Sequence, residues 1–257
     1  MKNKPFILLT NDDGIHSDGL MALYEELRQI ADVVIVAPLT EQSAVGHAIT
    51  ICDPIRVIEV PIENNEIIYA VKGTPADCVK IAVRALLPKR PNIVISGINT
   101  GSNTATNVIY SGTVSAATEG TILGIPSAAI SLDAFDSPDF SVAAQMGKRV
   151  AQLLLSEKLP SDTVLNINVP AVPKDQITGI RITRQGLSRF EEFYDRKVDP
   201  RGRIYYWLTG KMPKGDNEHN QTDTIAITQN AISITPLKIQ ITNNEFMESL
   251  EKWDFKI

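Results

Sequence analysis

The sequence predicts an α/β protein built on a doubly wound, mostly parallel β-sheet. Short apolar runs, typical of parallel strands covered on both faces, alternate with segments of helical periodicity up to about residue 170. Strands separated by helices in this order form right-handed βαβ units. Polar loops follow several of these strands, as in Rossmann-like sheets that bind ligands at the carboxyl edge.

The strands and helices of the first half follow in order. Residues 6–10 form a continuous apolar run, and apolar side chains at helical spacing follow over residues 20–30. Further strands are predicted at residues 33–37, 55–60, 67–71, 93–96, 128–131 and 164–167, and further helices at 75–87, 113–123 and 142–155. The strands at 55–60 and 67–71 are expected to form a hairpin-like insertion around residues 63–65.

Two helix ends are marked by specific residues. Thr74 can cap a helix, Pro75 suits its first position, and Asp77 puts a negative charge near the positive end of the helix dipole. Gly124 follows the helix predicted at 113–123, where a glycine often ends a helix.

The pattern changes in the last third of the chain. A strand is predicted at 179–183, followed by a polar, mixed-charge stretch over about 185–220. Within that stretch lies a strong β run at 204–208, and another strand is predicted at 231–235 and a short helix at 246–253. We therefore predict a core of residues 1–184 and a C-terminal β-hairpin and helix extension, 185–257, which completes the fold. The apolar run at 204–208 in this extension must either fold back on the core or pair with another chain.

Composition excludes several classes of protein. The chain has 257 residues, 43% of them hydrophobic, with 25 Lys and Arg against 30 Asp and Glu, a net charge of −5. This balance disfavours disorder and a nucleic-acid partner. Two cysteines and three histidines make a Cys/His zinc site unfavourable. The apolar N-terminal run is too short for a signal peptide and no stretch approaches a membrane span, so we expect a cytoplasmic protein without a membrane partner.

The densest group of chemically active side chains follows the first strand. Asp12 and Asp13 stand next to each other where the buried run ends. Two carboxylates in a partly dry crevice repel each other unless a cation joins them, and oxygen ligands suit a hard divalent ion. The alternative is that both residues simply form a turn before Gly14.

Two more polar clusters follow later strands. Asn99 and Asn103 lie in a glycine- and asparagine-rich segment after the strand at 93–96, where they could bind metal or phosphate or merely form a loop. Ser111, Gly112 and Thr113 precede a predicted helix, whose free N–H groups favour an anion, although Ser111 or Thr113 could serve only as a cap. The segment after the strand at 93–96 matches neither a dinucleotide fingerprint nor a P-loop.

A fourth candidate is the loop after the strand at 33–37. Ser43 and His47 could face the same crevice, with a structural or surface role more expected for His47 than catalysis. His16, just past the two aspartates, could help to bind an anion.

In this order the motifs resemble the survival protein SurE family over nearly the whole chain. They are Thr10-Asn11-Asp12-Asp13-Gly14, Gly73-Thr74-Pro75-Ala76-Asp77, Ser96-Gly97-Ile98-Asn99, Tyr110-Ser111-Gly112-Thr113, Glu119-Gly120 and Gly124-Ile125-Pro126-Ser127. Ala44 and Ala105 stand where glycine is common in that family.

The resemblance implies the SurE fold and a metal-dependent 5′-nucleotidase. The expected substrates are nucleoside 5′-monophosphates, with 3′-monophosphates and polyphosphate as further substrates. It implies that Asp12, Asp13, Ser43 and Asn99 ligate one divalent ion per subunit, Mg²⁺ or Mn²⁺ with Co²⁺ as a third candidate. It places the substrate at Asn99, Asn103, Ser111, Gly112 and Thr113, and it gives Asp12 and Asp13 the catalytic role.

Hydrolysis by metal-activated water is favoured over direct attack by an aspartate, because the two acids are adjacent and not separated by one residue as in haloacid dehalogenases. The resemblance also implies a homodimer or homotetramer in which the C-terminal extension reaches across a partner subunit. The alternative function is a nucleotide-binding regulatory protein without turnover.

Overall fold

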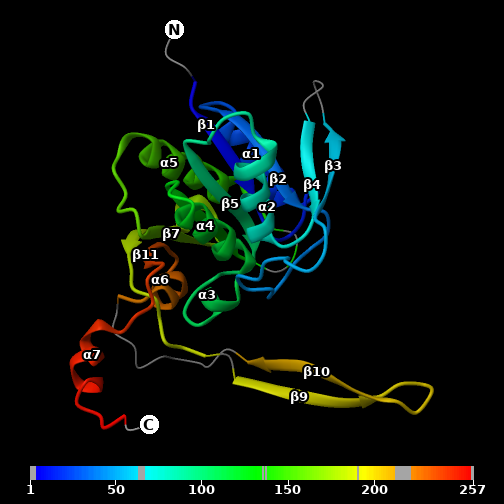
Figure 1. The fold of residues 1–257 in the computed structure, drawn as a ribbon, viewed down its shortest axis with the longest axis vertical. Coiled ribbons are helices and arrows are strands. Elements are labelled where there is room, and N and C mark those ends of the chain that lie inside the picture. The colour runs from blue at the N-terminus through cyan, green and yellow to red at the C-terminus, as the bar shows by residue number, and fades with distance from the viewer. Residues whose placement is uncertain are drawn as a thin grey trace.

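A mostly parallel β-sheet forms the centre of the protein (Figure 1). The computed structural model describes residues 4–62, 67–134, 136, 138–189, 191–211 and 221–255. Within these residues the sheet has nine strands in the order β3-β4-β2-β1-β5-β6-β7-β11-β8. Their bounds are β1 Phe6–Thr10, β2 Asp32–Pro38, β3 Arg56–Pro61, β4 Ile67–Lys72, β5 Ile93–Thr100, β6 Ser127–Asp133, β7 Thr163–Pro170, β8 Gly179–Ile182 and β11 Ala231–Lys238.

All neighbouring strands from β4 through β7 run parallel, which confirms the predicted fold class. β3 pairs antiparallel with β4, so the predicted hairpin insertion is present, although its turn lies outside the described residues. At the other side β11 pairs antiparallel with β7 and parallel with β8. β1 is buried along its whole length, as its uninterrupted apolar sequence predicts.

Helices cover both faces of the sheet. α1 (Asp18–Leu27) and α5 (Ser141–Ser156) pack on one face, and α2 (Pro75–Ile81) and α4 (Gly112–Ile122) pack on the other. Shorter helical segments are α3 (Asn107–Tyr110), α6 (Asp223–Thr228), α7 (Asn244–Leu250), a π-helical turn at Ala82–Leu86 and a 3-10 turn at Lys174–Gln176. None of the helices in the described part of the chain could span a membrane.

The two helix ends form as the sequence predicts. Thr74 caps α2 by accepting a hydrogen bond from the Asp77 N–H at 3.1 Å, and the Asp77 carboxylate accepts one from the Thr74 N–H at 2.9 Å. Gly124 follows α4 with a φ of 75°, a left-handed conformation that glycine adopts easily.

Some boundaries and short elements differ from expectation. β5 continues through Asn99 and Thr100, whereas loop-forming residue types after Ser96 predicted its end there. Its pairing with β6 shifts register between Ser96 and Asn99, so the strand bulges and continues. α3 and α6 have four and six residues, too few to show helical periodicity.

A two-stranded hairpin projects from the body of the molecule (Figure 1). It consists of β9 (Glu191–Val198) and β10 (Ile204–Lys211), paired antiparallel. β10 was predicted, but β9 was missed because its charged sequence has no apolar alternation and depends on β10 for its backbone hydrogen bonds. The chain then returns to the core, where β11 inserts between β7 and β8.

We predict that Gly120→Ala destabilises the fold at the contact of α4 with β5 and β6. An added Cβ would lie 2.4 Å from the Ser127 Oγ and 2.9 Å from a methyl group of Val94, whose branched side chain is stiff. Overpacking of this kind lowers the free energy of unfolding by about 1–3 kcal/mol.

Gly147→Ala on α5 is the matched control. There the added Cβ would meet only the terminal methyl groups of Leu23 and Ile130, which can rotate away, and alanine favours the helix by up to about 1 kcal/mol. Urea unfolding should therefore separate the two variants. Equal stabilities would contradict the tight contact of α4 with β5 and β6.

Candidate active site

The candidate site is a pocket at the carboxyl edge of β1 and β5. Its volume is about 560 Å³. The pocket is lined by Asp12, Ser43, Ala44, Asn99, Thr100, Gly101, Ser102, Asn103, Asn107, Tyr110, Ser111, Glu192 and Leu208. Five of the residues singled out from the sequence therefore share one pocket, and they come from three segments distant in the chain.

The turn after β1 is held in shape by Asn11. Its side-chain amide donates to the Gly14 carbonyl at 2.9 Å and to the Ser17 hydroxyl at 2.7 Å. Ser17 is also the N-cap of α1, so the turn is tied directly to the helix that follows it. This arrangement fixes the backbone of Asp12 and Asp13 at the end of the buried strand.

Asp12 lies at the base of the pocket with only 5% of its surface exposed. Burial raises the pKa of Asp12 to about 6, a hydrogen bond from the Thr113 hydroxyl to Oδ1 opposes this rise, and the neighbouring Asp13 carboxylate adds to it. The protein thus holds a carboxylate where its negative charge is unfavourable without a compensating positive charge.

Asp13 is less buried, and its environment is similar. Burial raises the pKa of Asp13, a hydrogen bond from the Thr100 N–H to Oδ2 at 3.1 Å opposes the rise, and the Glu41 carboxylate adds to it. Within the described residues no Lys, Arg or His forms an ion pair with Asp12 or Asp13. The two aspartates and Glu41 therefore concentrate negative charge beside the pocket.

The start of α4 packs directly against Asp12. Ser111 is the N-cap, and its hydroxyl accepts from the Val114 N–H at 3.1 Å. A Cβ at Gly112 would lie 2.7 Å from the Asp12 Cβ, so only glycine lets the helix approach this closely. Gly112 and Thr113 do not line the pocket themselves, but they support the Asp12 carboxylate from behind.

The two asparagines of the pocket, Asn99 and Asn103, differ in their hydrogen bonds and therefore in which atoms could bind a ligand. The Asn99 amide nitrogen donates to the carbonyls of Thr100 and Gly101 at 3.2 and 2.6 Å, which leaves its side-chain oxygen as the available ligand atom. Asn103 is 8% exposed and donates to the Ser131 hydroxyl at 2.8 Å. Its backbone N–H binds Asn168, and its carbonyl accepts from Asn166 and Asn168. Asn103 therefore joins α4, β6 and β7 at the pocket wall.

Ser43 stands on the exposed loop after β2. Its hydroxyl donates to the Glu41 carboxylate at 2.5 Å. Ala44 and Ala105 have φ values of 56° and 50°, which lie in the left-handed region that favours glycine. His47 lies away from the pocket and pairs with Glu119, and the exposed His16 does not line the pocket.

The donor set fits a hard divalent cation. Asp12, Asp13, Ser43 and Asn99 offer carboxylate, hydroxyl and amide oxygens, the ligands that Mg²⁺ and Mn²⁺ prefer. Among the described residues no group of three or more His, Cys, Asp and Glu side chains has the arrangement of a metal site, so the set has to be completed by neutral oxygens. Burial disfavours the ionised forms of both aspartates, and a positive charge beside them would favour those forms.

Sequence reasoning missed part of the pocket. Glu192 and Leu208, on β9 and β10, line its outer part together with Asn107 on α3. Nothing in the local sequence links these hairpin residues to a site formed more than 80 positions earlier in the chain. Glu41, whose carboxylate accepts a hydrogen bond from Ser43, is also absent from the predicted site residues, although its place two residues before Ser43 could have indicated it.

Comparison with known proteins points to one family. The model of the family described as survival protein SurE matches residues 7–192. A 5′-nucleotidase SurE of Syntrophobacter fumaroxidans is 48% identical over 248 residues, covering 96% of this chain and 99% of that protein. One of Syntrophus aciditrophicus is 49% identical, covering 95% and 92%. A crystal structure of the SurE protein of Aquifex aeolicus superposes with a TM-score of 0.83 at 39% identity, covering 96% and 98%.

We predict that Thr113→Val raises the pKa of Asp12 further above about 6. The hydroxyl of Thr113 stabilises the ionised carboxylate, and a hydrogen bond to a charged group contributes about 1.5 kcal/mol or more, so the proton affinity should increase roughly tenfold. Carbon-13 NMR titration of the aspartate carboxyl groups in chelator-treated protein measures this.

Thr118→Val is the control, because that hydroxyl lies on the same helix and binds only the Val114 carbonyl. It should leave the Asp12 titration unchanged. An Asp12 titration in Thr113→Val that coincides with that of the unmodified protein would contradict the role assigned to this hydrogen bond.

Proposed function

Because this chain belongs to the survival protein SurE family, we propose that it is a metal-dependent 5′-nucleotidase that releases phosphate from nucleoside 5′-monophosphates. The observation that carries the proposal is the buried Asp12 carboxylate, whose pKa is raised to about 6, at the base of a pocket beside the α4 N-terminus. A cation would stabilise the carboxylates, and the helix end favours the phosphate.

The proposed ligands of the cation are Asp12, Asp13, Ser43 and Asn99. A divalent ion such as Mg²⁺, Mn²⁺ or Co²⁺ would supply positive charge to the phosphate and lower the pKa of water. The chain fixes its ligands in advance: Thr113 orients Asp12, Thr100 orients Asp13, and the backbone carbonyls around Gly101 orient Asn99. Ser43 has to turn from Glu41 toward the aspartates to join them.

The start of α4 is the proposed phosphate site. The first backbone N–H groups of a helix have no partner within the helix, and here they follow Ser111 at the pocket wall. Donors that are fixed before the reaction stabilise negative charge that develops on phosphate oxygens. Asn103 is hydrogen-bonded to Ser131 of β6 and Asn168 of β7 at this wall. We assign it a role in substrate binding because it lines the pocket there.

Water is the favoured nucleophile. One oxygen of Asp12 is held by the Thr113 hydroxyl, and the carboxylate is packed against Gly112. A hydrogen bond accepted by a carboxylate oxygen lowers the nucleophilicity of that carboxylate. The restraint favours Asp12 and Asp13 as fixed ligands over a covalent aspartyl-phosphate route.

The outer part of the pocket offers room for the nucleoside. Tyr110, Asn107 and Leu208 line it with an aromatic, an amide and an apolar side chain, and its volume lies in the range of small-molecule sites. Because the pocket is open to solvent on its outer side, we also propose 3′-monophosphates and polyphosphate as substrates. Phosphate release from each of these substrates, assayed with Mg²⁺, Mn²⁺, Co²⁺ and a chelator, tests these proposals and separates an enzyme from a nucleotide-binding regulator.

We propose a cytoplasmic location because both cysteines of the chain are free thiols. Both Cys52, which is exposed, and Cys78, which is buried, carry free thiols. An exposed thiol such as that of Cys52 persists in a reducing compartment, where disulfides are rare.

We predict that Asp13→Asn lowers phosphate release from a nucleoside 5′-monophosphate by at least ~100-fold with little effect on folding, because charge supplied at the metal contributes several kcal/mol to transition-state stabilisation. Circular dichroism and colorimetric phosphate assays at saturating Mn²⁺ measure both. Asp175→Asn, a change of the same type at an exposed position outside the pocket, should retain full activity. Near-normal turnover of Asp13→Asn would contradict the proposed metal site.

Residues 185–257 are proposed to mediate assembly into a homodimer or homotetramer. On the β9–β10 hairpin Tyr206 and Trp207 have 58% and 64% of their surfaces exposed. An isolated two-stranded hairpin is marginally stable in water, and adjacent exposed aromatic side chains favour contact with another protein surface. A second copy of the chain supplies such a surface.

We predict that Tyr206→Asp combined with Trp207→Asp dissociates the oligomer to monomers while the core stays folded, because buried charges oppose the contact. Light scattering across a range of concentrations measures the mass. Ile58→Asp with Ile67→Asp on the β3–β4 hairpin, where exposure is 47% and 48%, is the matched control and should keep the oligomer. A hairpin variant with unchanged mass, or an unmodified protein that is already monomeric, would contradict the proposal.

A further inference from the structure

We propose that Glu119 is a positioning residue that fixes the Ser43 loop over the two aspartates, acting through His47. The loop is the segment of residues 39–55 between β2 and β3, and it brings Ser43 and Glu41 to the pocket region. The role given to Ser43 rests on the proposed function, whereas the attachment of the loop to Glu119 is independent of it.

The loop has little structure of its own to hold it. Its 17 residues contain no helix or strand, and Ser43 is exposed. Ala44 and Gly46 have φ values of 56° and 59°, so two left-handed residues stand within three positions. Such a conformation, unfavourable for alanine, persists only where surrounding contacts impose it. The contacts on either side of these residues therefore decide where Ser43 lies.

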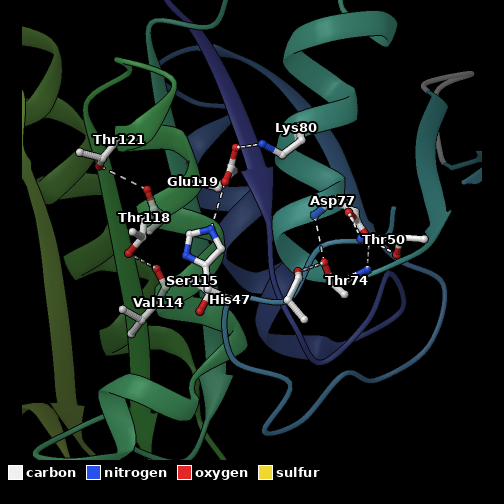
Figure 2. A network of polar contacts seen from close by, with 12 residues as sticks. His47, Thr50, Thr74, Asp77, Lys80, Val114, Ser115, Thr118, Glu119 and Thr121 are labelled. Atoms are coloured by element: carbon white, nitrogen blue, oxygen red, sulfur yellow. Dashed lines mark hydrogen bonds and ion pairs between the residues drawn. The ribbon is translucent and has the colours of Figure 1, made fainter. Parts of the chain in front are cut away.

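Glu119 provides the contact next to these residues (Figure 2). Its side chain is 3% exposed on α4, where Oε2 lies 3.0 Å from the His47 Nε2 and Oε1 lies 2.6 Å from the Lys80 Nζ of α2. Burial by itself raises the pKa of Glu119, but the hydrogen bonds and charges of His47 and Lys80 outweigh it and lower the pKa overall. The carboxylate stays ionised and joins the loop to two helices.

Two further sets of hydrogen bonds hold the loop on either side of His47. Before it, the Gln42 N–H donates to the Asp12 carbonyl at 2.8 Å and the Gly46 N–H to the Tyr110 carbonyl at 3.0 Å. After it, the Asp77 carboxylate accepts from the N–H and the hydroxyl of Thr50 at 2.9 and 2.6 Å. Figure 2 shows these two acidic residues, Glu119 on α4 and Asp77 on α2, which hold the loop at His47 and Thr50.

The position of Glu119 couples this contact to the rest of the pocket. α4 begins at Gly112, which packs against Asp12, and it carries Glu119 two turns later on the same helix. One helix therefore supports the Asp12 carboxylate at its first turn and holds the Ser43 loop through His47 further on. The His47 part of the loop is therefore attached to the same rigid element that supports Asp12.

The test uses substitutions at His47, whose side chain is 32% exposed and less critical for folding than that of Glu119. His47→Ala removes the contact. His47→Gln places an amide nitrogen near the position of Nε2 and should restore it. Lys148→Ala is the matched control, because it removes a half-buried Lys–Glu contact between α5 and α1, at 2.9 Å, on the other face of the sheet.

Two measurements are made on the full chain. Hydrogen exchange of the Gly46 amide in chelator-treated protein should accelerate at least ~10-fold in His47→Ala and Glu119→Gln but not in His47→Gln or Lys148→Ala. The Mn²⁺ dissociation constant, followed by electron paramagnetic resonance without substrate, should rise at least ~10-fold in the same two variants only.

The outcomes separate the two proposals. Unchanged Gly46 exchange in His47→Ala overturns the inference, whatever the enzyme does. Faster exchange with an unchanged Mn²⁺ dissociation constant overturns the effect on the metal site. If the unmodified protein binds no Mn²⁺ and releases no phosphate, the proposed function fails, and the exchange measurement still decides whether Glu119 fixes the loop. Equal weakening of Mn²⁺ binding in Lys148→Ala would show a general loss of stability and overturn the positioning role.

Discussion

The structure depends on one electrostatic constraint, the two adjacent carboxylates at the end of a buried strand. Asp12 is almost fully enclosed and its pKa is raised to about 6, with Asp13 beside it. A charge in this environment is unfavourable unless hydrogen bonds and a cation compensate for it. The nearby chain supplies the hydrogen bonds from the Thr113 hydroxyl and the Thr100 N–H, but no ion pair within the described residues.

The parallel sheet brings distant parts of the chain close to the two carboxylates. Because the strands run in the same direction, β1 and β5 present their carboxyl ends at the same edge. α4 reaches that edge from the other side, and Gly112 lets its first turn contact Asp12 closely. The helices and strands thus provide rigid supports, while the Ser43 loop contains no helix or strand and is held by backbone hydrogen bonds to Asp12 and Tyr110 together with the His47–Glu119 contact.

The hairpin adds a different kind of element. β9 and β10 project from the α/β body, yet Glu192 and Leu208 line the outer part of the pocket. The same hairpin therefore carries a pocket residue, Leu208, and an exposed aromatic residue of the proposed assembly surface, Trp207. A contact made by the hairpin with a second copy of the chain would also stabilise one wall of the pocket.

The sequence by itself determined the doubly wound core, the cap at Thr74 and the main candidates for the pocket, because an apolar strand, a capping residue before Pro75 and the pair Asp12-Asp13 are local patterns. Tertiary structure alone decided the rest. The continuation of β5 through Asn99 needs its bulged pairing with β6, and β9 needs β10. Glu119 meets His47 72 residues away, and Leu208 meets a pocket formed by the first half of the chain. Contacts between residues so far apart leave no periodicity or spacing in the sequence, since they arise only when the sheet and its helices have packed.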